Sequence, residues 1–173
     1  MAAIEIEPSR LPPVCVLDAG VMILALNQRV HRPDSGTCIA LWKALVDRER
    51  LKAGARVLIP APALAELIRG TAKQEPPRSQ GVFVAPFTAR TARYLSLHVS
   101  DALIETAVGE TRLPRAYLKY DALIAATAIS ADATLIALDG WFHRQKWPIA
   151  VRHPQYFTRA QMPLDFRDPA KPG

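Results

Sequence analysis

Carboxylates that could act together are found at widely separated positions of the chain, namely Asp18, Glu66, Asp121 and Asp139. Asp18 and Asp139 each follow a short apolar run of strand length, Glu66 lies one turn inside a predicted helix, and Asp121 is predicted to open another helix. Carboxylates held close together repel one another unless they are protonated or bridged by a cation. Because hard oxygen ligands suit Mg²⁺ or Mn²⁺, these acids predict a divalent metal site.

The chemistry of such a site is hydrolysis of a phosphodiester. One or two divalent ions held by carboxylates and water can orient a water nucleophile, lower its pKa and neutralise charge on the phosphodiester. No organic cofactor is needed. Other catalytic patterns are weak, because the chain has no GxSxG, P-loop or HExxH motif and its four histidines share no ligand-like spacing.

Each acid taken singly also has a simpler local use. Asp18 could cap the helix that follows it, Asp139 could favour an Asp-Gly turn with Gly140, and Asp121 could serve only as a helix-start residue. Glu66 lies among apolar residues, where burial would demand a partner. The order of the four acids along the chain favours a shared site over four separate accidents.

The apolar runs alternate with helical patterns. Short strands are predicted at 14–17, 56–59, 82–84, 134–138 and 149–151. Helices are predicted at 21–26, from 35 to about 54, and at 63–69, 88–100, 101–109, 121–131 and 141–146. This alternation indicates an α/β fold with a central, mostly parallel sheet of four to five strands and helices on both faces. Functional groups in such sheets gather beyond the carboxyl ends of the strands, so the acids should meet at one rim.

Length and composition indicate one domain. A chain of 173 residues with 50% hydrophobic content can bury one real core but is too short for two ordinary ones. We expect an N-terminal extension at 1–13, the domain at 14–157 and a C-terminal tail at 158–173. No apolar run approaches the ~20 residues of a membrane span, and no signal peptide is recognisable, so a cytoplasmic location without membrane association is expected. Cys15 and Cys38 are expected to be reduced core residues.

The chain is basic, with a net charge of +6 and a pI near 9.7. This is compatible with a polyanionic partner but decides little, because a basic pI is also common among proteins that bind no nucleic acid. Basic residues near the predicted rim are weaker candidates for contacting phosphates: Arg69, Lys73, Arg115, Lys119 and Arg144.

Three segments carry a family resemblance: VCVLDAGVMI, IPAPALAELIRG and YDALIAATAISADATLIALDGWF. They resemble the successive motifs of PIN-domain ribonucleases, most strongly the VapC-type toxins of bacterial toxin–antitoxin pairs. The likeness extends from about residue 14 to residue 157. Within it, the family's acidic metal-binding quartet is matched by Asp18, Glu66, Asp121 and Asp139.

The resemblance implies a Mg²⁺- or Mn²⁺-dependent endoribonuclease that cuts single-stranded or structured RNA. It implies a homodimer, with an interface on the helices that carry Leu95, Leu97, Leu103 and Ile104, and a cognate antitoxin whose tail enters the acidic groove. In this hypothesis Asp18 and Asp121 are the principal metal ligands. Glu66 binds the metal directly or through water, and Asp139 holds a water or a second ion.

Two positions depart from the family pattern. A small hydroxyl or amide residue is common where this chain has Gly20, and Thr is common where it has Ala137. Loss of such a supporting hydrogen bond can cost ~10 to 100-fold in metal affinity or activity. The alternative hypothesis is therefore a catalytically silent PIN-fold module that binds RNA or protein.

Overall fold

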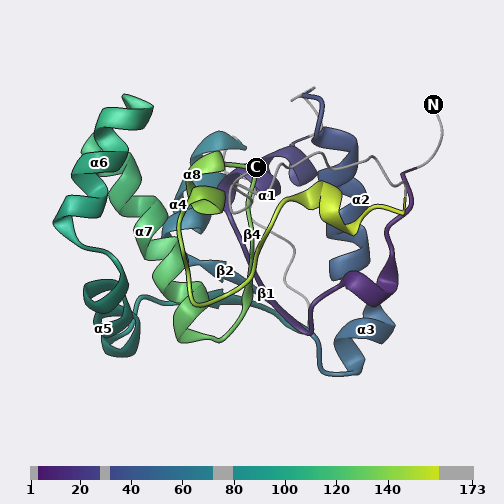
Figure 1. The fold of residues 1–173 in the computed structure, drawn as a ribbon. Helices are drawn as coiled ribbons and strands as arrows, with labels where there is room; N and C mark the ends of the chain where they lie inside the picture. Colours follow the sequence, from purple (N-terminus) through teal and green to yellow (C-terminus); the bar gives the residue numbers. More distant parts are fainter. Residues whose placement is uncertain (1–3, 28–31, 72–79, 160–173) are drawn as a thin grey trace, which may run out of the picture.

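The computed structural model describes residues 4–27, 32–71 and 80–159, and a parallel sheet lies at its centre (Figure 1). The five strands are β1 (Val14–Leu17), β2 (Arg56–Pro60), β3 (Val82–Ala85), β4 (Thr134–Ile136) and β5 (Val151–Arg152). Their order across the sheet is β3-β2-β1-β4-β5, and every neighbouring pair is parallel. The predicted fold class is confirmed, although β4 is shorter than predicted and β5 begins two residues later.

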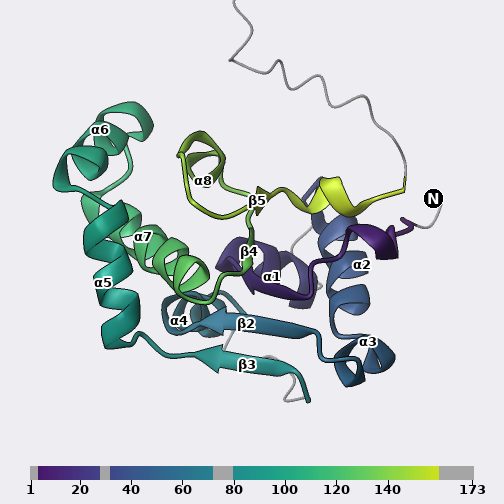
Figure 2. The ribbon, with the colours of Figure 1, turned by 60° about the horizontal axis from the view of Figure 1, so that its bottom comes forward.

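Helices connect the strands. They are α1 (Ala19–Leu26), α2 (Ser35–Leu45), α3 (Arg48–Lys52), α4 (Ala61–Gly70), α5 (Ala89–His98), α6 (Asp101–Thr111), α7 (Arg115–Ser130) and α8 (Gly140–Arg144), with short 3-10 turns η1 (Pro8–Arg10) and η2 (Pro154–Phe157). Helix α7 packs on β1, β2 and β4 and also contacts α4. Helices α5 and α6 pack against α7 on the side away from α1 and α2 (Figures 1 and 2).

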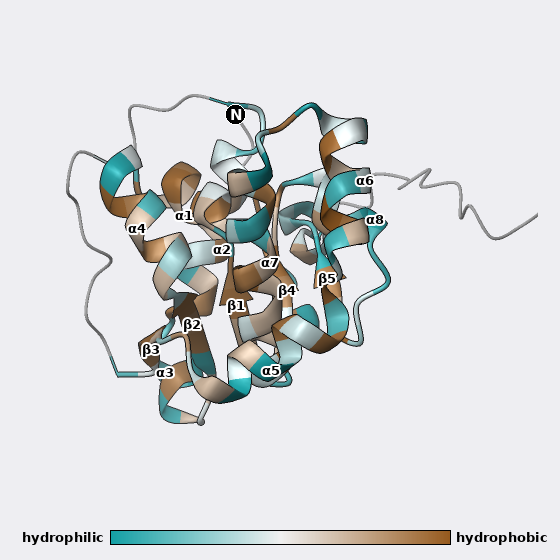
Figure 3. Ribbon diagram, turned by 90° about the vertical axis from the view of Figure 1, so that its left-hand side faces the viewer, coloured by the Kyte–Doolittle hydropathy of each residue, from teal (hydrophilic) through white to brown (hydrophobic). Residues whose placement is uncertain are grey.

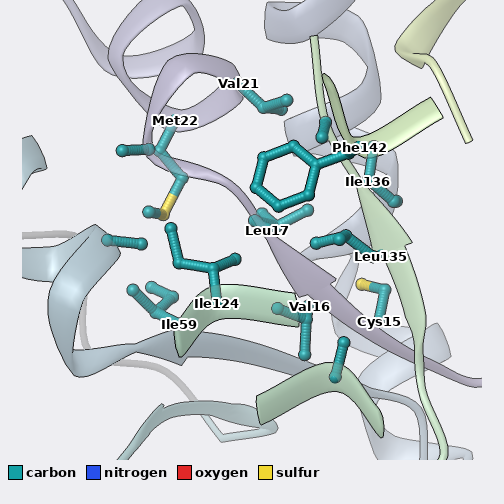
Figure 4. Close-up of a cluster of buried hydrophobic side chains, with 14 of the residues drawn as sticks. Cys15, Val16, Leu17, Val21, Met22, Ile59, Ile124, Leu135, Ile136 and Phe142 are labelled. Carbon is teal, nitrogen blue, oxygen red and sulfur yellow. The ribbon is translucent and has the colours of Figure 1, made fainter. Parts of the chain in front are cut away.

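The central strand β1 is buried on both faces. Cys15, Val16 and Leu17 are each 0% exposed, and successive side chains of a strand point to opposite faces. Met22 of α1 and Ile124 of α7 lie in the same cluster of buried side chains (Figure 4). Hydrophobic residues are also concentrated on β1 and β2 in Figure 3. Burial of both faces is the expected consequence of helices that cover a parallel sheet on two sides.

The prediction of one helix from residue 35 to about residue 54 is wrong. Helix α2 ends at Leu45, and α3 begins at Arg48. The carboxylate of Asp47 accepts hydrogen bonds from the amides of Glu49 (3.1 Å) and Arg50 (3.0 Å). An aspartate that satisfies free amides in this way starts a new helix, and here it divides the predicted one.

The prediction that Asp121 opens a helix is also wrong. Helix α7 begins at Arg115, directly after Pro114, so Asp121 lies inside the helix. The sequence did not indicate this earlier start, because Leu118 is the only residue among 115–120 that is buried and these positions therefore form no apolar stripe toward the core. Asp121 is therefore held by a continuous helix and does not act as its cap.

The two ends of the described chain lie against each other. Ile6 forms an antiparallel bridge with Thr158, and the amide of Glu7 donates to the carbonyl of Phe157 at 2.7 Å. Phe157 is fully buried. The predicted tail at 158–173 falls largely outside the described residues. Within the described part, no helix is both long and apolar enough to cross a membrane.

Candidate active site

Asp18 lies at the carboxyl end of the central strand. The last residue of β1, Leu17, is in register with Ile136 of β4, and the amide of Asp18 donates to the Ile136 carbonyl at 3.0 Å. Its side chain caps α1, because Oδ2 accepts a hydrogen bond from the amide of Gly20 at 3.2 Å. The residue is only 7% exposed. The strand and the cap together fix this carboxylate at the rim of the sheet.

Asp139 lies at the same rim, three residues after the end of β4. Its Oδ1 accepts a hydrogen bond from the amide of Trp141 at 2.6 Å and so caps α8. Since β1 and β4 are parallel neighbours, their carboxyl ends bring Asp18 and Asp139 to one edge. Asp18 and Asp139 therefore cap helices and also lie at one shared site, although the sequence presented these two uses as alternatives.

Glu66 and Asp121 reach this edge from two helices. Helix α4 directly follows β2, the other neighbour of β1, and carries Glu66. Helix α7 crosses the sheet and carries Asp121. Both side chains are partly buried, and they line one cavity of about 530 Å³ together with Asp18 and Asp139. The structure thus brings together all of the acids singled out in the sequence.

The electrostatics of this cavity disfavour the charged carboxylates. Burial, followed by repulsion from Asp18, Asp139 and Glu66, raises the pKa of Asp121 to about 8. Burial raises the pKa of Asp18 to about 7, with smaller contributions from Glu66 and Asp139 and an opposing one from two backbone amides. Burial also raises the pKa of Glu66. A bound cation would offset this repulsion and stabilise the ionised forms.

A divalent cation fits the chemistry of this cavity, because the donors are carboxylate oxygens gathered at one place. The described residues nevertheless contain no group of three or more acidic, cysteine or histidine side chains that already has metal-ligand geometry. Asp18 and Asp139 each direct one oxygen to a backbone amide. Binding would therefore require the carboxylates to turn toward a common point.

Other residues of the cavity were not anticipated from the sequence. Arg32, Leu113 and Tyr117 line it beside the acids, and all of them are exposed. Tyr117 precedes Asp121 by four residues, so the two side chains share a helix face once α7 is known to begin at Arg115. No pattern in the polar segment around Arg32 indicated that its side chain would face the acids.

The two departures from the family pattern have structural counterparts. A Cβ atom at Gly20 would lie 3.1 Å from Oδ2 of Asp18, closer than an ordinary contact. Ala137 is fully buried, and its carbonyl accepts a hydrogen bond from Nε2 of His143 at 3.0 Å. Glycine at position 20 therefore leaves room for the carboxylate that caps α1.

Those basic residues named from the sequence that the structure describes are not gathered in one cavity. Arg69 lines a small cavity together with Glu66, whose pKa it lowers through its charge. Arg144 lines a different cavity, between α6 and α8. Lys119 is exposed on α7, and Lys73 lies outside the described residues.

Arg115 is engaged by the neighbouring helix. Its guanidinium forms ion pairs with Asp101 (2.8 Å) and Glu105 (2.7 Å), both on α6. These acids compete with any phosphate for the guanidinium, which makes Arg115 a weaker candidate for binding a polyanion than Arg69.

The comparison with known proteins agrees with this arrangement. The family model of the PIN domain matches residues 15–148. No curated protein sequence matches the chain.

Among solved structures, VapBC2 from Rickettsia felis, bound to a DNA fragment from its promoter, is similar with 20% identity over 81% of this chain and 98% of that chain (TM-score 0.49). FitAB bound to an IR36 DNA fragment has 20% identity over 81% of this chain and 94% of that chain (TM-score 0.48). FitAcB from Neisseria gonorrhoeae has 18% identity over 82% of this chain and 99% of that chain (TM-score 0.48). Because the family model covers most of the sequence and its span contains all four acids of the cavity, the chain belongs to the PIN-domain family.

Proposed function

We propose that this protein is a metal-dependent endoribonuclease that hydrolyses RNA phosphodiester bonds and acts as the toxin of a toxin–antitoxin pair. The observation that carries the proposal is the cavity lined by Asp18, Glu66, Asp121 and Asp139 in a PIN-domain chain. PIN domains are generally nucleases. The carboxylates gathered in this cavity repel one another, so bound protons or cations would stabilise the folded protein by neutralising their charge.

In this proposal Asp18 and Asp121 hold the Mg²⁺ or Mn²⁺ ion, and Glu66 contributes directly or through water. Asp139 holds a water or a second ion. When bound, the metal lowers the pKa of a water nucleophile and neutralises charge on the phosphodiester. The caps of α1 and α8 restrict the side chains of Asp18 and Asp139, which keeps them at the rim.

Positively charged side chains beside the acids would draw the RNA backbone to this rim. Arg32 lines the acidic cavity, and Arg69 lies one helical turn after Glu66. Both are exposed and so can meet a phosphate at little desolvation cost. These residues bind and orient the polyanion, and the carboxylates do not repel it once they are neutralised.

The toxin role rests on the motifs shared with VapC-type proteins around Asp18, Glu66 and Asp121. It includes a homodimer and a cognate antitoxin whose tail enters the acidic groove. A neighbouring short reading frame with a DNA-binding N-terminal segment would support this role. A housekeeping nuclease would have no such neighbour.

A catalytically silent module that binds RNA or protein is the second candidate. Two observations favour it: the absence of hydroxyls at Gly20 and Ala137, and the lack of a ready metal-ligand cluster among the described residues. Metal-dependent stabilisation distinguishes the candidates, because an ion that binds only the native state must raise its stability.

The deciding experiment is cleavage of labelled total RNA by the pure protein in Mn²⁺, Mg²⁺ or chelator. Asp121→Asn removes an acid of the cavity and is the test variant. Asp132→Asn is the matched control, since Asp132 is exposed, does not line the cavity and has a left-handed backbone that asparagine also adopts.

The nuclease is supported if the wild type and Asp132→Asn produce discrete fragments only when metal is present, and if Asp121→Asn produces none. If the well-folded wild type neither cleaves RNA nor is stabilised by either ion, the nuclease proposal fails and the silent module is favoured.

A further inference from the structure

A second, smaller cavity adjoins the acidic one. It has a volume of about 150 Å³ and is lined by Ala65, Glu66 and Arg69 of α4 and by Ala116, Tyr117 and Tyr120 of α7. Glu66 and Tyr117 line both cavities. A molecule bound at the carboxylates can therefore extend directly into this second space, between two helices that pack against each other.

Two exposed aromatic rings form one wall of the smaller cavity. Tyr117 is 52% exposed and Tyr120 is 47% exposed. They are three residues apart on α7, so their side chains lie on the same face of the helix. The opposite face of α7 is anchored in the core by residues such as Leu118 and Ala122, which fixes the helix beneath the rings.

A positive charge faces this aromatic wall. Arg69 is exposed and follows Glu66 by three residues, which places both side chains on one side of α4. Its charge is close enough to Glu66 to lower the pKa of that carboxyl. Beside the acidic cavity, the chain therefore offers aromatic faces and a guanidinium, the combination by which proteins bind single-stranded nucleic acids.

We propose that Tyr117, Tyr120 and Arg69 form a subsite for one unpaired nucleotide adjacent to the scissile phosphate. The base stacks on a tyrosine ring, and Arg69 binds a neighbouring phosphate. The inference rests on the proposed nuclease function and specifies its substrate class. In a duplex the base faces are hidden by stacking and pairing, so the subsite selects RNA that is single-stranded at the cut.

Binding can be measured apart from cleavage by fluorescence anisotropy in chelator, which withholds the divalent ions that hydrolysis would need. The probes are a labelled oligouridylate and an oligomer of the same length made of abasic ribose phosphates. The variants are Tyr117→Ala, Tyr120→Ala and the corresponding phenylalanine substitutions. Phe83→Ala on β3 is the matched control, because Phe83 is 48% exposed and lines neither cavity.

We expect the wild type to prefer oligouridylate to the abasic oligomer. Alanine at the tyrosine that stacks on the base should weaken binding of oligouridylate by about tenfold and leave the abasic oligomer unaffected, whereas the phenylalanine variants should retain the preference. Phe83→Ala should bind both probes as the wild type does. Arg69→Ala should weaken binding of both probes and lower the dependence of affinity on salt.

Equal binding of the two probes by the wild type would overturn the subsite, and so would alanine variants that bind as the wild type does. Tyrosine-dependent binding together with no metal-dependent cleavage would support the subsite and reject the nuclease, so the two proposals fail separately.

Discussion

At the scale of single residues, Asp18 both caps α1 and lines the acidic cavity. The cap uses Oδ2, which accepts the amide hydrogen of Gly20. Hydrogen bonds from backbone amides lower the pKa of this carboxyl, but burial has the larger effect and raises it to about 7. The same conflict is stronger at Asp121, whose pKa is about 8. In the metal-free protein, ionisation of these two acids therefore destabilises the folded state.

This conflict predicts a falling stability of the metal-free protein as pH rises from the ordinary carboxyl pKa of 3.8 to about 8. In that window the folded state holds protons that the unfolded state has lost, so the free energy of unfolding decreases with pH. Asp121→Asn cannot ionise and should make the decrease shallower. At the upper end of the window it should exceed the wild type by about 1 to 3 kcal/mol.

Urea unfolding in chelator across this pH range measures the effect. Asp132→Asn should follow the wild type, because its side chain is exposed. A wild-type stability that rises toward pH 8 would contradict the raised pKa values of Asp18 and Asp121.

Replacing Gly20 with alanine should weaken metal binding without lowering the stability of the fold. In Gly20→Ala the new Cβ would lie 3.1 Å from Oδ2 of Asp18 and press on the carboxylate. Alanine favours a helix by up to about 1 kcal/mol over glycine, so the fold should be maintained or slightly stabilised. The increase in melting temperature caused by Mn²⁺ should shrink. An unchanged response to Mn²⁺ would show that the carboxylate adjusts freely.

At the scale of elements, the position of a helix start decides which side chains reach the cavity. Because α7 begins at Arg115, its first turns carry Tyr117 to the acidic rim and Arg115 to α6. The parallel strands set the other side of the rim, since Asp18 and Asp139 follow neighbouring strands. The site is therefore assembled by residues that follow β1 and β4 and by residues of α4 and α7.

This arrangement predicts different effects for two arginines. Arg115 is paired with Asp101 and Glu105, whereas Arg69 adjoins the acidic cavity. Arg69→Glu should weaken RNA binding about tenfold or more at low salt, and Arg115→Glu should weaken it much less. Filter binding at two salt concentrations would measure both. Equal losses for the two variants would mean that RNA also contacts α6.

At the scale of the whole molecule, α5 and α6 form an outer layer against α7 (Figure 1). Among the residues expected at a dimer interface, Leu97 is 74% exposed, Leu95 and Leu103 are partly buried, and Ile104 is buried. Only Leu97 is fully available to a partner. One exposed apolar side chain is ordinary on a protein surface, so the dimer remains an expectation from the family resemblance, and Leu97 is the residue that can test it.

We predict that Leu97→Asp converts a dimer into a monomer, because it places a charge where an apolar contact is expected. Sedimentation velocity of the wild type and the variant measures the change. Leu97→Met preserves the apolar contact and should remain dimeric. A dimer that persists in Leu97→Asp would place the interface on another surface.

The sequence by itself determined the alternation of strands and helices, the single α/β fold and the acids of the site. These features depend on local signals, such as apolar runs that fill a buried strand and side chains that cap a helix. Thr88, at the start of the helix predicted at 88–100, is an example, because its hydroxyl accepts a hydrogen bond from the amide of Thr91 at 3.2 Å and caps α5. The order of the four acids was recognisable because two of them follow strands and the other two lie in helices that the sequence also predicted.

Only the tertiary structure decided which side chains accompany the acids. It placed Tyr117 and Arg32 in the acidic cavity, paired Arg115 with α6 and raised the pKa of Asp121. It also divided the helix predicted from residue 35 at Asp47 and moved the start of α7 to Arg115. The physical reason is that contacts, burial and repulsion join residues that are distant in the chain, whereas periodicity and capping concern neighbours.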